Sequence, residues 1–105
     1  MNEQQIREIV EKGKEQLYSL FEEIPLEIKK KTIEKTENIF SFLSLETQPF
    51  AISFLIDFFK LVYDLPASSE DFSGTHHTGE FGLFLHSLEV CEKVLKKGKE
   101  ISFIP

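Results

Sequence analysis

The segment FAISFLIDFFKLVY, residues 50–63, is the most apolar part of this chain, and it decides the fold class. Asp57 and Lys60 are its only charged residues. A helix that is apolar around most of its circumference is either buried or covered by a partner. Thr47 followed by Pro49 is a helix start signal just ahead of the segment. We therefore expect a Phe-rich helix here that presents at most a narrow strip to water.

Two amphipathic stretches precede the Phe-rich helix. Apolar residues recur at helical spacing from Asn2 to about Phe21, and Asn2 is placed to cap the start of this first helix. Pro25 suits the first turn of a second helix, whose looser apolar stripe ends near Leu45. No stretch of the chain alternates with a period of two for long enough to predict a strand.

The chain changes character after the Phe-rich helix. Residues 65–80 contain Pro66, Gly74 and Gly79 together with three serines, a composition that predicts a loop. A final helix is expected over residues 81–98, with Gly98 as its stop. The sequence thus predicts a single all-α domain over residues 1–105, with four to five helices: N-terminal helices in 1–64, the loop at 65–80 and the last helix.

Bulk composition narrows the class of protein. A chain of 105 residues is the size of one domain, with room for a modest core. Its net charge of −6 repels nucleic acid at long range. The single cysteine, Cys91, excludes an internal disulfide and fits a reducing compartment. The charged N-terminus lacks a signal peptide, and no apolar run is long enough to span a bilayer, so we expect a cytoplasmic protein without a membrane contact.

All three histidines, His76, His77 and His86, fall in the loop and the last helix. Neutral imidazole is a common ligand of divalent metals, and a loop that leads into a helix can bring these side chains together. The alternative is that His86 is a partly buried side chain bonded to a backbone carbonyl, and that the other two are polar surface. The grouping favours a metal site, for Mn, Fe, Ni, Zn or Mg.

Gly79 and Gly82 flank the start of the last helix. Glycine permits a positive φ or a close backbone approach at such a junction. The exposed N–H groups at the helix N-terminus attract phosphate, so these glycines are candidate phosphate-binding positions. The alternative is an ordinary loop-to-helix junction.

The motifs of this region resemble one known family as a set. They are LPAS at 65–68, HH at 76–77, Gly79, Gly82, Leu83 and HSLEV at 86–90. Together they resemble the N-terminal part of the TraI-type helicase or relaxase domain of conjugative plasmids and integrative elements, a domain similar to the HD metal-dependent phosphohydrolases. The resemblance covers about a quarter of the chain and implies a partial HD-domain-like helical bundle.

The resemblance also implies roles for the histidines. His86 matches the first histidine of the HD pattern, a metal ligand in the family. His76 and His77 match part of a run of three histidines, in which Thr75 stands at the remaining position. The defining His-Asp dipeptide and the final aspartate lie downstream in the family, and this chain contains no His-Asp.

We therefore expect a truncated HD-type domain, related to phosphohydrolases and conjugative relaxases. It is not catalytically competent alone and holds a divalent ion weakly at most, because most ligands are missing. A nucleic-acid partner is implied by the resemblance alone.

Two alternatives stand beside this interpretation. The chain is a small helical interaction module without enzymatic activity, in which the Phe-rich helix 50–63 and the apolar residues 101–105 are covered by a second copy or by a partner protein. In the last alternative, two copies pool their histidines to form an assembled enzyme.

Overall fold

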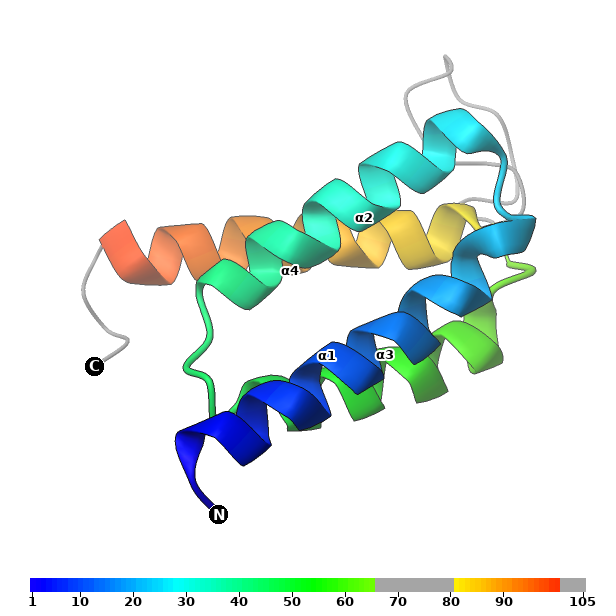
Figure 1. Cartoon of the computed structure of the whole chain (residues 1–105). Helices are drawn as coiled ribbons and strands as arrows, with labels where there is room; N and C mark the ends of the chain where they lie inside the picture. The colour runs from blue at the N-terminus through cyan, green and yellow to red at the C-terminus, as the bar shows by residue number, and fades with distance from the viewer. Residues whose placement is uncertain (66–80, 101–105) are drawn as a thin grey trace.

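The computed structural model describes residues 1–65 and 81–100. They form α1 (Glu3–Leu20), the short 3-10 helix η1 (Phe21–Glu23), α2 (Leu26–Ser41), α3 (Gln48–Val62) and α4 (Gly82–Glu100) (Figure 1). These described residues contain no strand, so the predicted all-α class with four to five helices is confirmed. None of these helices combines the length and the apolar character that crossing a membrane requires.

The start of α1 has the cap that the sequence predicts. The Asn2 side chain accepts a hydrogen bond from the Gln5 N–H at 2.8 Å, and the Gln5 side chain accepts one from the Asn2 N–H at 2.9 Å. This reciprocal pair is a capping box, which satisfies two N–H groups that the helix itself leaves unpaired. It fixes where α1 begins.

The end of α2 comes earlier than predicted, at Ser41 rather than near Leu45. The Gln48 side-chain amide donates to the carbonyl oxygens of Phe40 and Leu43, at 3.4 and 3.2 Å. Terminal carbonyls of a helix need such donors from outside it. The first residue of α3 therefore closes the end of α2, and the connection between the two helices is short.

The prediction that Gly98 stops α4 is wrong, because the helix continues through it to Glu100. Gly98 is buried, and the Lys99 Nζ lies 5.7 Å from the centre of the Phe42 ring, at the end of α2. Glycine inside a helix costs about 1 kcal/mol relative to alanine. Packing of the last turn of α4 against α2 offsets that cost.

The helices α1 and α3 form a parallel pair. Gly13 lies against Ile52, and further along both helices the rings of Phe21 and Phe59 are 5.4 Å apart. Because the contacts advance in the same direction along both helices, the two helices are parallel. A Cβ placed on Gly13 would lie 2.9 Å from Ile52 Cγ2, so glycine allows the close approach of these two helices.

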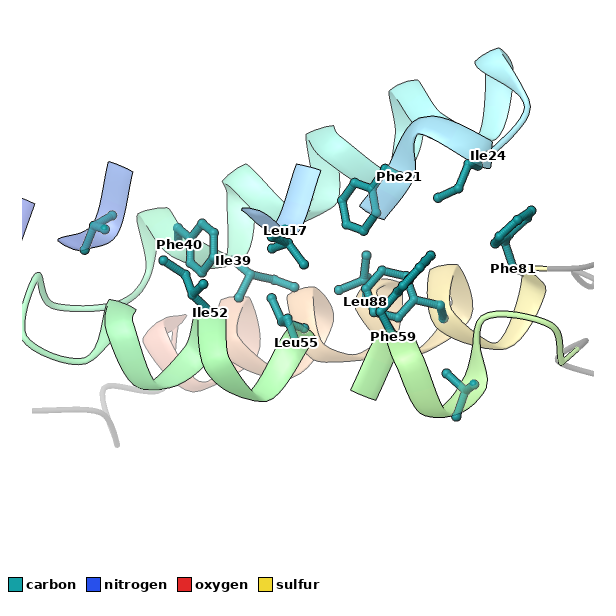
Figure 2. Close-up of a cluster of buried hydrophobic side chains, with 13 residues drawn as sticks. Leu17, Phe21, Ile24, Ile39, Phe40, Ile52, Leu55, Phe59, Phe81 and Leu88 are labelled. Carbon is teal, nitrogen blue, oxygen red and sulfur yellow. The ribbon is translucent and has the colours of Figure 1, made fainter. Parts of the chain in front are cut away.

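A second parallel pair is formed by α2 and α4, and it runs in the opposite direction to the first (Figure 1). Lys35 pairs with Glu92 at 3.0 Å, and seven residues later on each helix Phe42 meets Lys99. The two pairs enclose the hydrophobic core between them. Figure 2 shows side chains from all four helices in this core, among them Leu17, Ile39, Phe59 and Leu88.

Three phenylalanine rings join the two pairs at the centre of the core. Phe59 meets Phe84 edge to face, at 4.9 Å between ring centres and 87° between planes. Phe21 lies 5.7 Å from Phe84, so the three rings contact one another. Edge-to-face contacts of this kind stabilise by about 0.5–1.5 kcal/mol beyond the area that they bury. These ring contacts fix the positions of η1, α3 and α4 relative to one another.

The junction that leads into α4 differs from the sequence prediction. The left-handed backbone falls on Phe81, with φ 68°, and the helix begins at Gly82, one residue later than predicted. The Phe81 N–H donates to the Tyr63 carbonyl at 2.8 Å. The Phe81 ring is buried and stacks on Phe59. Ring burial and this hydrogen bond stabilise a conformation that is unfavourable for a bulky residue.

The contact between Gly13 and Ile52 gives a test of the α1–α3 packing. Gly13→Val should lower the free energy of unfolding in urea by about 1–3 kcal/mol, because the new side chain forces the stiff Ile52 side chain aside. Glu11→Val, at an exposed position of the same helix, is the control and should cost about 0.5 kcal/mol, from helix propensity alone. Equal losses in the two variants would show that α1 and α3 are not in close contact here.

Candidate functional site: an apolar groove beside the Phe-rich helix

The helices α3 and α4 converge at one end and leave a groove at the other. They meet where Phe58 and Phe59 contact Phe84. Towards the start of α3 lies a groove of about 370 Å³. Its main lining residues are Ile39 of α2, Leu43 just beyond the end of α2, Phe50 and Phe54 of α3, and Cys91 and Leu95 of α4. Among residues 1–65 and 81–100, Thr47 and Ser87 are the only polar residues that line it, and no charged side chain does.

The outer face of α3 is apolar and open to solvent. Phe50 is 77% exposed, Phe54 65% and Leu61 75%. We call these three residues the outer stripe. The prediction that the Phe-rich helix presents only a narrow strip to water is therefore wrong. The core covers just one side of α3, through residues such as Leu55 and Phe59, and leaves the opposite side bare.

The outer stripe adjoins the groove through Phe58. Phe58 is half-buried, and its ring stacks on Phe54 with 5.8 Å between ring centres and 11° between planes. The Phe58 ring also meets Phe84 of α4. The groove and the outer stripe thus form one continuous apolar surface over α3 and its neighbours.

Polar contacts on the far side of α4 hold one wall of the groove in place. The Glu92 carboxylate accepts from the Asn38 amide at 2.6 Å and from the Lys35 ammonium at 3.0 Å. The Asn38 hydrogen bond and the Lys35 ammonium lower the pKa of Glu92, and the bond to Glu92 raises the pKa of Lys35. Both groups are charged at neutral pH, so this link between α2 and α4 persists there.

A second polar cluster ties α1 to α2. The Tyr18 hydroxyl donates to the Glu37 carboxylate, and the Lys14 Nζ lies 3.4 Å from the same carboxylate and 5.0 Å from the centre of the Phe40 ring. Burial and the neighbouring carboxylate raise the pKa of Tyr18 well above its usual range, so the phenol stays neutral. The frame around the groove is therefore fixed by contacts that lie outside it.

Cys91 contributes to the groove as an apolar wall. Partial burial raises the pKa of its thiol, so the sulfur is protonated at neutral pH. A protonated thiol is a poor nucleophile and a poor metal ligand, because both roles require the thiolate. Because the described lining residues carry only two hydroxyl groups, the groove that they form offers apolar contact and almost no means of orienting a polar ligand.

The structure describes only one of the three predicted metal ligands, His86. His76, His77 and Gly79 lie outside the described residues. His86 is half-buried on α4 and lies far round the helix from the groove, because Ser87 and Cys91, one turn apart, mark the groove side. In the described ranges 1–65 and 81–100, no group of three or more His, Cys, Asp or Glu side chains is placed to hold a metal ion. The metal site stays a prediction.

Comparisons of this chain with protein-family models, with curated proteins and with solved structures found no match. The groove is therefore interpreted from its own chemistry. The sequence predicts no role for the α4 side of the groove, although Ser87, Cys91 and Leu95 recur every four residues and so mark one face of a helix. Which face of α4 meets α3 depends on tertiary packing.

The metal prediction can be tested by calorimetric titration of the folded chain with Mn²⁺, Ni²⁺ or Zn²⁺. We expect weak binding, reduced about tenfold or more in His86→Ala and in the double variant His76→Ala/His77→Ala, since each change removes a predicted imidazole ligand. Asn2→Ala, at the opposite end of the chain, is the control and should bind as the unmodified protein does. Unchanged binding in His86→Ala would remove His86 from the site.

Proposed function

We propose that this chain is a helical interaction module, which binds an apolar face of another helix in the groove and along the outer stripe of α3. The single observation that carries the proposal is the continuous apolar surface, which runs from Leu43, just beyond α2, across Phe50 and Phe54 to Leu95 on α4. An exposed apolar patch of this extent usually marks a site of contact with another protein.

A helix is the ligand that best matches the shape of this surface. From Phe50 to Phe58 the apolar side chains recur every four residues, over about 12 Å, which is a little more than two helical turns. A groove of about 370 Å³ is too small for a whole helix, but it accommodates the side chains that one helix face projects. Binding of an amphipathic helix by successive apolar anchors is a recurring mode of recognition.

The fixed frame also supports a binding role. The Lys35–Glu92 pair and the aromatic cluster around Phe59 position α3 and α4 before any ligand arrives. A surface that is already ordered loses less conformational entropy on association. The exposed rings of Phe50 and Phe54 provide large contact area with only two side-chain torsions each.

The phosphohydrolase interpretation is a separate proposal, which rests on the resemblance of residues 65–90 alone. His86 is the one member of its predicted ligand set that lies within the described residues, and it lies away from the groove. The two proposals concern different parts of the molecule, so an HD-type domain that acts as an interaction module satisfies both.

The proposal is tested by titrating the full chain into a fluorescein-labelled amphipathic peptide of leucine and glutamine, and by following its fluorescence anisotropy. Phe54→Glu should weaken binding about tenfold or more, because it places a charge at the centre of the apolar surface. Leu26→Glu is the matched control, since Leu26 on α2 is exposed to the same extent, 65%, but lies outside this surface.

Leu26→Glu should leave the peptide affinity unchanged. Circular dichroism of each variant verifies that the helices are retained. If Phe54→Glu binds the peptide as tightly as the unmodified chain does, or if both variants lose affinity equally, the groove and the outer stripe are not the binding surface.

A further inference from the structure

We infer that the helix which covers the outer stripe is α3 of a second copy of this chain, packed antiparallel to the first. The inference rests on the proposed function and names its partner. Two observations support it: the spacing of the exposed apolar residues along α3, and the positions of its two charged residues, Asp57 and Lys60.

The exposed apolar residues are placed symmetrically about one point of the chain. Phe50 and Phe54 lie four residues apart before it, and Leu61 and Leu65 lie four residues apart after it. Leu65, just beyond α3, is 44% exposed, and its carbonyl accepts from the Leu83 N–H at 3.0 Å, which fixes its position. The midpoint of all four residues falls between Asp57 and Phe58.

Antiparallel packing about that midpoint pairs these four residues with one another across the interface. Phe50 lies opposite the partner's Leu65, and Phe54 lies opposite the partner's Leu61. A two-fold axis generates each contact twice, which is the usual symmetry of a homodimer interface. Parallel packing in register would instead place Phe50 opposite the partner's Phe50, and it would put the flank that bears Asp57 and Lys60 on opposite sides of the interface in the two copies, so that these charges could not pair.

The two charges complement each other in the antiparallel arrangement. Asp57 and Lys60 are exposed on the same flank of the outer stripe, and within residues 1–65 and 81–100 neither forms an ion pair. At a rise of about 1.5 Å per residue, Asp57 and the partner's Lys60 differ by about 3 Å along the helix axis. Two symmetric ion pairs therefore flank the axis. Exposed pairs of this kind select orientation more than they add affinity.

The area of the surface fits a dimer. With about 150–250 Å² for each large apolar side chain, the exposed fractions of Phe50, Phe54, Leu61 and Leu65 leave roughly 400–650 Å² of apolar surface on each copy. A standard interface buries about 800 Å² per partner, of which the apolar centre is one part. In this packing the partner's Leu61 and the partner's Leu65 also come to the mouth of the groove.

Sedimentation of the full chain between 1 and 500 µM tests the inference. We expect a reversible monomer–dimer equilibrium that Leu61→Glu abolishes and that the control Leu26→Glu leaves unchanged. Asp57→Lys and Lys60→Asp should each weaken the dimer about fivefold, since each brings like charges together across the axis. The double variant Asp57→Lys/Lys60→Asp should recover the original affinity, because it exchanges the two partners of each pair. All these positions are exposed, so the fold is retained.

Disulfide trapping in a Cys91→Ser background provides a second measurement that does not depend on affinity. The variant Asp57→Cys carries its thiol near the axis and should cross-link two copies on mild oxidation, whereas Phe50→Cys should not. Efficient cross-linking of Phe50→Cys, or failure of the double charge exchange to restore the dimer, would overturn the antiparallel arrangement.

A chain that stays monomeric at 500 µM, or a dimer that Leu61→Glu does not affect, would overturn the second copy as the partner. The peptide titration separates this failure from failure of the proposed function. A monomer that binds the peptide through Phe54 keeps the interaction module and loses the homodimer, whereas a monomer that does not bind the peptide loses both.

Discussion

The packing of Phe59 against Phe21 and Phe84 is the contact on which the rest of the structure depends. Phe59 is 5% exposed, and its ring meets Phe84 edge to face while it also touches Phe21. Each residue of a helix is turned by about 100° from the one before, so fixing one side chain inward fixes the direction of all the others. Once Phe59 points into the core, Phe54 and Leu61 must point out. The exposed apolar face is a consequence of core packing.

The remaining contacts stabilise this orientation of α3 and leave its outer face uncovered. Gly13 lets α1 approach α3 closely on one side, and the Lys35–Glu92 pair holds α4 to α2 on another. Neither contact covers the side of α3 that bears Phe50. A chain of this size has a limited core, and four helices packed as two pairs bury only part of a helix that is apolar nearly all round. An additional helix, from a second copy, would cover the rest.

The sequence predicted local features well and packing poorly. Helical periodicity gave the all-α class, and the cap at Asn2 is as expected, because both depend on neighbours in the chain. The buried side of the Phe-rich helix could not be read from its sequence, since nearly every side is apolar and only the contacts of Phe59 decide. The predicted helix stop at Gly98 was wrong, and Phe81 lies one residue ahead of α4 rather than within it, because tertiary contacts outweigh the local preference of each residue. The groove combines residues of α2, α3 and α4, and helical periodicity does not show which faces of these helices meet. The candidate metal site could not be compared with its prediction, because His76 and His77 lie outside the described residues.

The most direct measurement of this division of α3 into a buried and an exposed face compares two substitutions of the same residue type. At a concentration where the chain is monomeric, Phe59→Ala should lower the free energy of unfolding by about 3–5 kcal/mol, because it leaves a cavity in the core. Phe54→Ala, on the same helix, should change it by less than about 0.5 kcal/mol. Similar losses for the two variants would contradict the account, because they would place Phe54 within the core.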